Sequence, residues 1–145
     1  MMSVQRILGT KASGGVISVQ PGTSVADAAA VLSSKRIGAV IVSADGKHMA
    51  GILSERDIVR ELGRRGAACL TDPVDALMTQ KVMTCALLDR TTGVLERMTE
   101  GRFRHMPVLE GDEIVGMISI GDVVKARLAE LKTEVDALEG MIKGF

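Results

Sequence analysis

Two segments of the sequence pair a serine with an aspartate three residues later, directly after an apolar run. One runs from Ser54 to Asp57 and the other from Ser119 to Asp122. Where a strand leads into a helix, such a serine accepts a hydrogen bond from a free helix N–H. The acid then lies in the first turn, against the positive end of the helix dipole. The pattern is therefore typical of a helix start, and a duplicated helix start needs no further function.

The same geometry also suits a phosphorylated sugar. Free N–H groups and the partial positive charge at a helix N-terminus bind phosphate, and a nearby hydroxyl adds a further contact. An ionised aspartate only accepts hydrogen bonds, so its two oxygens can take both hydroxyls of a ribose, as the acidic residue of dinucleotide-binding folds does. A single strand–helix junction could thus hold sugar and phosphate together, and the helix cap and the ligand site both stay open.

The flanking residues indicate an internal duplication. Three pairs of segments match in register: Gly51–Val59 with Gly116–Val124, Ile37–Val42 with Phe103–Val108, and Val16–Val19 with Val82–Cys85. The chain is therefore two copies of one unit. A unit of roughly 60 residues is small for an independent domain, so we expect the two copies to pack on each other.

Each copy has the pattern strand, helix, strand, strand, helix. The elements predicted for the two copies are strands 16–19 and 82–85, helices 25–34 and 91–100, strands 37–42 and 105–109, strands 49–53 and 114–118, and closing helices from about 55 and 120. Polar turns at 44–47 and 110–113 predict a hairpin inside each copy. A hairpin within such a unit favours an α+β fold over a purely parallel α/β sheet. Residues 63–80, interrupted by glycines and by Asp72-Pro73, form the predicted connector.

The whole arrangement resembles the cystathionine-β-synthase (CBS) domain pair, also called a Bateman module, and in particular its small stand-alone bacterial type. The resemblance rests on Met83-Thr84, on His105-Met106-Pro107-Val108 and on the segment 116–122, and it covers about 7–128. It implies an α+β fold of two pseudo-symmetric β-α-β-β-α CBS repeats packed together. Their expected bounds are 7–66 and 74–130, followed by a C-terminal helix extension at 131–145.

Members of that family bind adenosine-bearing ligands such as AMP, ADP, ATP, S-adenosylmethionine or NAD in clefts between the two units. Carried over by motif, Asp57 and Asp122 would hold ribose hydroxyls, and Ser54 and Ser119 would touch phosphate. Backbone polar groups would recognise the adenine base at Val16, Ile17, Val82, Met83 and Thr84. The other nucleotide-binding residues that the resemblance implies are Arg36, Gly38, Arg56, Arg104, His105, Met106, Pro107 and Gly121.

The two copies differ where the ligand would lie. The second has Arg104-His105-Met106-Pro107 where the first has residues 38–41, and Gly121 stands where the first has Arg56. We therefore expect two inequivalent clefts, one for an AMP-type ligand and one for a different or larger ligand such as NAD(H). For His105, a strand histidine satisfied by its neighbours is favoured over a phosphate contact, and solvated surface explains the basic residues as well as phosphate binding does.

A long helix is predicted from Asp122 to about Lys143. Its apolar residues alternate in spacing between four and three and form a heptad stripe: Val124, Leu128, Leu131, Val135, Leu138 and Ile142. We expect the first turns of this stripe to pack on their own domain and the last three turns to contact a second subunit. The family resemblance likewise implies a homodimer.

Composition narrows the classes of function. The 145 residues carry 18 basic and 18 acidic side chains, and Phe103 and Phe145 are the sole aromatics. That balance argues against nucleic-acid binding. No apolar run is long enough for a membrane helix and no signal core begins the chain, which predicts a cytoplasmic protein with no membrane contact. Cys69 and Cys85 lack metal-ligand spacing and are expected to be buried free thiols.

These observations predict a non-catalytic regulatory sensor of adenosine nucleotides that requires no cofactor. No motif identifies its downstream protein partner. A structural or interaction dimer module with unoccupied clefts would share the fold and is the alternative. An enzyme such as a nucleotide hydrolase is not expected, because the sequence shows no paired carboxylates, metal ligands or activated nucleophile.

Overall fold

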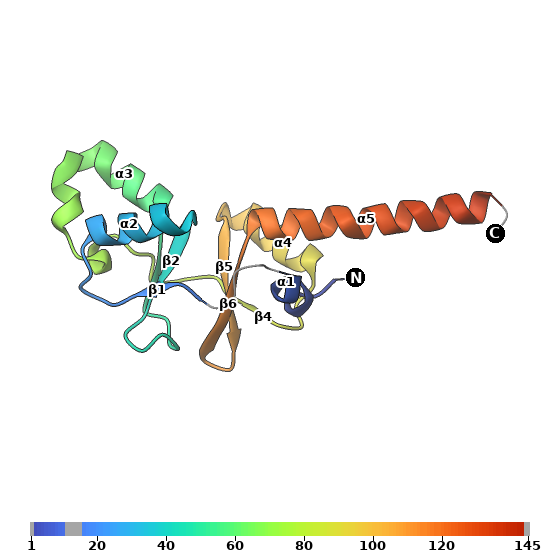
Figure 1. Ribbon diagram of the computed structural model, residues 1–145, viewed down its shortest axis with the longest axis horizontal. Coiled ribbons are helices and arrows are strands. Elements are labelled where there is room, and N and C mark those ends of the chain that lie inside the picture. The colour runs from blue at the N-terminus through green and yellow to red at the C-terminus, as the bar shows by residue number, and fades with distance from the viewer. Residues whose placement is uncertain (1, 11–15, 144–145) are drawn as a thin grey trace. The chain divides into compact units, whose positions relative to one another are not determined.

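The first repeat forms a three-stranded sheet with two helices in the computed structural model, which describes residues 2–10 and 16–143 (Figure 1). Strand β1 (Ser18–Val19) pairs in parallel with β2 (Ala39–Val42), and β2 pairs antiparallel with β3 (Gly51–Ser54). Helix α2 (Val25–Lys35) connects β1 to β2, and α3 (Glu55–Arg65) follows β3. The predicted order of strand, helix, strand, strand and helix is confirmed.

The second repeat has the same order. Its sheet runs β4 (Cys85–Ala86), β5 (His105–Glu110), β6 (Glu113–Ser119), with α4 (Thr91–Gly101) between β4 and β5 and α5 (Ile120–Ile142) after β6. The fold is therefore α+β, with two β-α-β-β-α repeats and a C-terminal helix of 23 residues. In the part of the chain that the structure describes, no helix combines the length and the apolar character needed to cross a membrane.

The first helix of each repeat ends in the same unusual conformation. The chain leaves α2 through Arg36 at φ 54° and leaves α4 through Arg102 at φ 56°. Both are left-handed and neither is glycine, which costs each residue about 1 kcal/mol. The backbone N–H of each arginine donates to a carbonyl of the last helical turn, Leu32 or Met98. This recurrence is local evidence of the pseudo-symmetry that the sequence duplication predicts.

Each repeat has its own apolar core. The first surrounds β2, all four of whose residues are buried, and comprises Val25, Ala28, Leu32, Val40, Val42, Leu53, Ile58, Val74 and Leu77. The second comprises Val4, Ile7, Cys85, Val94, Met98, Met106, Val108, Ile118, Val123 and Ala126. Burial of a strand on both faces explains why β2 is a continuous apolar run instead of an alternating one.

The predicted connector 63–80 belongs to the first core. Helix α3 continues to Arg65, and the 3-10 helices η1 (Gly66–Thr71) and η2 (Val74–Ala76) follow it. Val74 is fully buried, and its N–H donates to the carbonyl of Thr23 at 2.8 Å. Further along, the N–H and carbonyl of Ile52 bond to Thr79 at 3.0 and 2.9 Å. The segment that connects the repeats is therefore an ordered part of the first core, since tertiary packing orders it despite its glycines.

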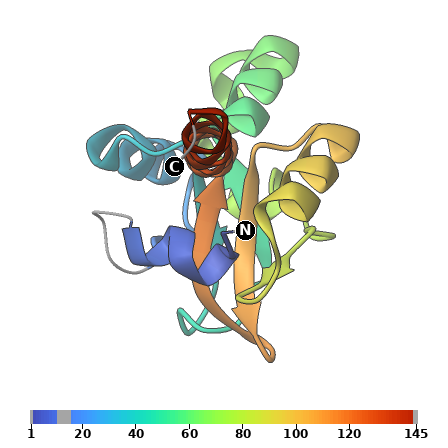
Figure 2. The ribbon, with the colours of Figure 1, turned by 90° about the vertical axis from the view of Figure 1, so that its right-hand side faces the viewer.

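An N-terminal helix that the sequence analysis did not predict completes the second core. Helix α1 (Val4–Thr10) buries Val4 and Ile7, and the N–H of Val4 donates to Asp89 at 2.9 Å. Both α1 and α4 lie against the first part of α5 (Figure 2). The chain accordingly forms two compact units. The first-repeat unit holds 16–83 and 109–116, and the second-repeat unit holds the described residues up to 10, 84–108 and 117–143.

The opening strands are shorter than predicted. Strand β1 begins at Ser18 and β4 at Cys85, whereas the expected strands began at Val16 and Val82. Pairing nevertheless extends one residue before β1, because the carbonyl of Ile17 accepts a hydrogen bond from Ile41 at 3.2 Å. Positions 11–15 of the predicted first repeat lie outside the described residues.

One buried hydrogen bond attaches α5 to the second-repeat unit. The hydroxyl of the fully buried Thr91 donates to the Glu130 carboxylate. Burial raises the pKa of Glu130, but hydrogen bonds from Thr91 and from the Met2 backbone, with the charge of Arg127, outweigh it and hold the pKa below its ordinary value.

The variant Thr91→Val is expected to lower the free energy of unfolding at pH 7 by about 1–3 kcal/mol, because it leaves the Glu130 carboxylate without this donor. A carboxyl with a lowered folded-state pKa stabilises above its unfolded pKa of about 4.3 and loses that contribution as pH falls through the folded value. The difference between the variant and the wild type should therefore shrink below about pH 4. Urea titrations at pH 7 and pH 3.5 measure it. Thr133→Val, at an exposed threonine of α5, is the matched control and should change stability by less than about 0.5 kcal/mol.

Candidate functional site

The first strand–helix junction holds a buried carboxylate at the start of α3. Asp57 is only 8% exposed. Its Oδ2 accepts hydrogen bonds from the backbone N–H and the hydroxyl of Ser54, both at 3.0 Å, and its Oδ1 accepts one from Arg60 Nη2 at 2.8 Å. The Ser54 hydroxyl in turn accepts from the N–H of Asp57 at 3.2 Å. The expected capping box is present.

In this geometry the Asp57 carboxylate can still accept hydrogen bonds from a ligand. A carboxylate offers about four lone-pair sites, and protein groups occupy three of them here. The guanidinium of Arg60 is the displaceable donor, since its side chain is 61% exposed. The hydroxyl of Ser54 must rotate away from Asp57 before it can donate to a phosphate.

The second junction repeats the arrangement at the start of α5. The N–H of Ser119 donates to Asp122 Oδ2 at 2.9 Å, and the Ser119 hydroxyl accepts from the N–H of Asp122 at 3.2 Å. Asp122 is half-buried. The junctions differ at the residue before the aspartate, where the exposed Arg56 stands in the first and the exposed Gly121 in the second. An arginine thus directly precedes Asp57 in the chain, whereas a glycine precedes Asp122.

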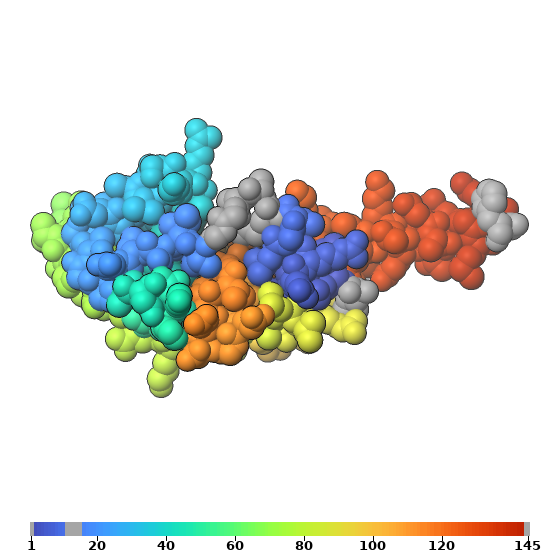
Figure 3. All heavy atoms as spheres, turned by 60° about the horizontal axis from the view of Figure 1, so that its bottom comes forward, coloured from blue at the N-terminus to red at the C-terminus, as the bar shows by residue number. Residues whose placement is uncertain are grey.

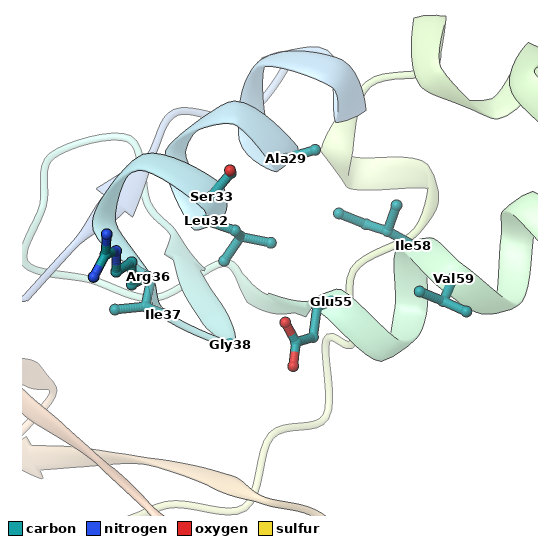
Figure 4. Close-up of a pocket in the computed structure, with 9 residues that line it drawn as sticks. All are labelled: Ala29, Leu32, Ser33, Arg36, Ile37, Gly38, Glu55, Ile58 and Val59. Atoms are coloured by element: carbon teal, nitrogen blue, oxygen red, sulfur yellow. The ribbon is translucent and has the colours of Figure 1, made fainter.

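A pocket of ≈ 470 Å³ opens between α2 and α3 (Figure 4). Its lining is Ala29, Leu32, Ser33, Arg36, Ile37, Gly38, Glu55, Ile58 and Val59. Two predicted site residues, Arg36 and Gly38, therefore lie together in it, whereas Ser54 and Asp57 do not line it. The N–H of Glu55 donates to the carbonyl of Gly38 at 2.9 Å, which joins the pocket to the start of α3.

In the second repeat, the predicted site residues divide between surface and core. Arg104 is exposed and His105 half-buried, whereas Met106 and Pro107 are buried. Met106 lies in the apolar core, so its side chain serves packing and only its backbone could face a ligand. The carbonyl of Arg104 accepts from the N–H of Ile120 at 2.8 Å, which holds this segment against the start of α5.

The segments expected to read adenine are partly accessible. Val16, Ile17, Val82 and Thr84 are half-buried and Met83 is exposed. Two of their carbonyls already have protein donors, since Ile17 accepts from Ile41 and Thr84 accepts from Arg97 Nη1 at 3.0 Å. Each of these two carbonyl oxygens keeps a second lone pair that could accept from the amino group of an adenine.

Sequence reasoning missed several residues of the site. The contact of Arg60 with Asp57 could have been predicted from the sequence, because residues three apart on a helix have neighbouring side chains. Arg97, which also pairs with Asp89 at 2.9 Å, has no such signal for its bond to Thr84. The apolar pocket residues Ile58 and Val59 look like ordinary helix residues until α2 is placed beside them.

The expectation for the cysteines is confirmed. Cys69 and Cys85 are both free and buried. Burial raises the pKa of the Cys85 thiol to about 11, so the thiol stays protonated and unreactive at neutral pH. Within residues 2–10 and 16–143 no group of histidine, cysteine, aspartate or glutamate side chains is arranged to hold a metal ion.

The chain is similar throughout to proteins with paired CBS domains. A CBS domain family model matches residues 11–64 and 74–129. The CBS domain-containing protein CBSX3, mitochondrial, of Arabidopsis thaliana is 31% identical over 145 residues, which span 97% of this chain and 70% of that protein. Two solved structures agree with the fold. One is a CBS-domain-containing protein from Agrobacterium tumefaciens, with 42% identity and a TM-score of 0.83 over 87% of this chain and 99% of that chain. The other is a CBS domain protein from Pyrobaculum aerophilum complexed with AMP, with 26% identity and a TM-score of 0.78 over 91% and 99%.

Proposed function

The chain belongs to the CBS domain family, and from that membership we propose that it is a non-catalytic sensor of adenosine nucleotides. The observation that carries the proposal is the buried Asp57 carboxylate, held at the start of α3 beside the exposed Arg56. A ribose diol needs an acceptor of this kind, and a phosphate needs a nearby cation and a helix N-terminus. The complex of the Pyrobaculum aerophilum relative with AMP supports this choice of ligand class.

In the proposed complex, Asp57 and Asp122 accept hydrogen bonds from ribose hydroxyls, and Ser54 and Ser119 donate to phosphate. Arg56 and Arg36 supply positive charge in the first repeat, and Arg104 and His105 supply it in the second. A bound nucleotide changes the relative stability of the states of the protein only by its differential affinity for them, which is how a sensor without catalysis signals. That the nucleotide lies in clefts between the repeats stays a prediction from the family.

The test is whether the purified protein carries or takes up a nucleotide. We expect denaturation of the purified protein to release an adenosine nucleotide that mass spectrometry identifies. After the nucleotide has been removed and the protein refolded, titration calorimetry with AMP should show saturable binding. A stripped protein that gives no heat with AMP, ADP, ATP, S-adenosylmethionine or NADH would favour the structural-module alternative. In that case both capping boxes serve only as helix starts.

The two junctions should differ in their ligands. Arg56 and the open Gly38 mark the first, whereas Gly121 and the Arg104-His105 pair mark the second. Calorimetry with AMP, repeated on protein saturated with NADH, is expected to show one site that retains AMP and one that does not. Two equal sites from which NADH displaces AMP completely would contradict the asymmetry.

A further inference from the structure

The apolar stripe of α5 faces away from the unit that carries it. Helix α5 packs on its unit through the buried Val123 and Ala126, whereas Val124 is 40% and Leu128 62% exposed. The remaining stripe residues, Leu131, Val135, Leu138 and Ile142, are exposed as well. The expectation that the first turns of the stripe pack on their own domain was therefore wrong. With 3.6 residues per turn, Val123 and Ala126 lie on a different side of the helix from the stripe.

The distal part of α5 has no covering from the described residues of its own unit. From 131 to 143 each residue is exposed except the half-buried Gly140. Figure 3 shows this part of α5 extending beyond the rest of its unit. An isolated helix of fewer than roughly 12–15 residues is only marginally stable in water, and residues 131–143 form a stretch of about that length without covering from the described residues. This stretch also presents large apolar side chains to solvent. A partner that covers the stripe would remove both costs.

We propose that α5 pairs with α5 of a second copy of the chain as an antiparallel two-helix coiled coil. The residues that flank the stripe determine the orientation. On one side they are Lys125, Lys132 and Glu139, and on the other Arg127, Glu134 and Met141. In a parallel pair, opposite sides meet, so Arg127 would face Lys132 of the second copy. Glu134 would likewise face Glu139. Both contacts join like charges, and each occurs twice.

An antiparallel pair joins like sides and improves the charge pattern. Glu139 near one end then lies among Lys132 and Lys125 of the second copy, and this contact also occurs twice. Two unfavourable contacts remain near the two-fold axis, where Lys132 and Glu134 each lie opposite the same residue of the second copy, but each occurs only once. The stripe is fully covered in this register, with the pairs Leu131–Val135, Leu128–Leu138 and Val124–Ile142 made twice each.

The role of the stripe in dimerisation is tested by introducing glutamates at two of its positions, one at the centre and one nearer the C-terminal end. The variant Leu131→Glu/Leu138→Glu is expected to be monomeric in sedimentation velocity at concentrations where the wild type is a dimer. It should fold normally, because both side chains are exposed. The matched control is Thr133→Glu/Ala137→Glu, two exposed positions off the stripe, which should remain dimeric. A monomeric wild type at about 100 μM, or a dimeric stripe variant, would overturn the proposal.

The orientation is tested by Glu139→Lys. In the antiparallel pair this change replaces attraction to Lys132 and Lys125 by repulsion, and it should weaken dimerisation roughly tenfold at low salt. In a parallel pair the same change would turn the Glu134 contact from repulsion into attraction and strengthen the dimer. Tighter or unchanged association of Glu139→Lys would therefore refute the antiparallel arrangement, whatever the protein binds at its strand–helix junctions.

Discussion

The double variant Asp57→Ala/Asp122→Ala is expected to lose measurable binding of AMP while it remains folded. Each carboxylate is the proposed acceptor for two ribose hydroxyls, and a hydrogen bond to a charged group contributes about 1.5–3 kcal/mol. Loss of two such bonds weakens a site by a factor on the order of 100 or more. Calorimetry of the nucleotide-free variant at wild-type concentrations measures this, with circular dichroism as the check on folding.

The fold must be separated from the ligand in this experiment, because both aspartates also cap helices. Removal of a capping interaction costs about 0.5–2 kcal/mol, which a stable domain tolerates. The chain supplies a matched control at α2, where the hydroxyl of Ser24 accepts from the N–H of the exposed Asp27 at 3.1 Å. This junction has the same serine–aspartate spacing but does not directly follow a strand. Asp27→Ala keeps the hydrogen bond to Ser24, because that bond uses the backbone N–H, and it removes only the favourable charge of the carboxylate at the helix N-terminus. It should therefore cost no more than about 1 kcal/mol and leave AMP binding unchanged.

Single variants extend the comparison. Asp57→Asn retains one oxygen that can accept from the N–H of Ser54, so the cap survives better than in Asp57→Ala, but the amide nitrogen cannot accept a ribose hydroxyl. We expect Asp57→Asn to lose affinity at one site with little loss of stability. If the folded double alanine variant bound AMP as tightly as the wild type, both aspartates would be helix caps and nothing more.

Local patterns predict most of this fold. The duplicated segments place both β-α-β-β-α repeats, and the serine–aspartate spacing places the first turns of α3 and α5 within a residue or two. Such features are visible because periodicity and capping act between neighbours in the sequence. Helix α1 and the segment 66–79 were missed because their order comes from distant partners, such as Asp89 for Val4 and Thr23 for Val74.

The candidate site was predictable only in part, for the same reason. The capping boxes at Ser54 and Ser119 follow from spacing alone, and the structure confirms both. The pocket between α2 and α3 depends on how two helices pack, which the sequence does not encode locally. The face of α5 shows the limit most clearly, since the heptad spacing predicts the stripe but not whether its own unit or another molecule covers it.

A small change at Gly51 is expected to destabilise the first-repeat unit strongly. A Cβ atom at this buried position would lie 2.7 Å from Met78 Sδ and 2.8 Å from the carbonyl oxygen of Thr79. The methionine side chain can move, but the Thr79 carbonyl accepts from the N–H of Ile52 at 3.0 Å and belongs to the backbone that closes over β3. Gly51→Ala must therefore displace the connector, at a cost of about 1–3 kcal/mol.

The cost of Gly51→Ala reports whether the connector is packed on β3, because a flexible linker would let Thr79 move aside at no cost. Gly63→Ala is the matched control, since nothing lies within 4 Å of the added Cβ and position 63 is inside α3. There, alanine should stabilise the protein by up to about 1 kcal/mol through helix propensity. Guanidinium titrations of the two variants should thus shift in opposite directions. Equal midpoints for Gly51→Ala and the wild type would mean that residues 78–79 do not pack on β3 in solution.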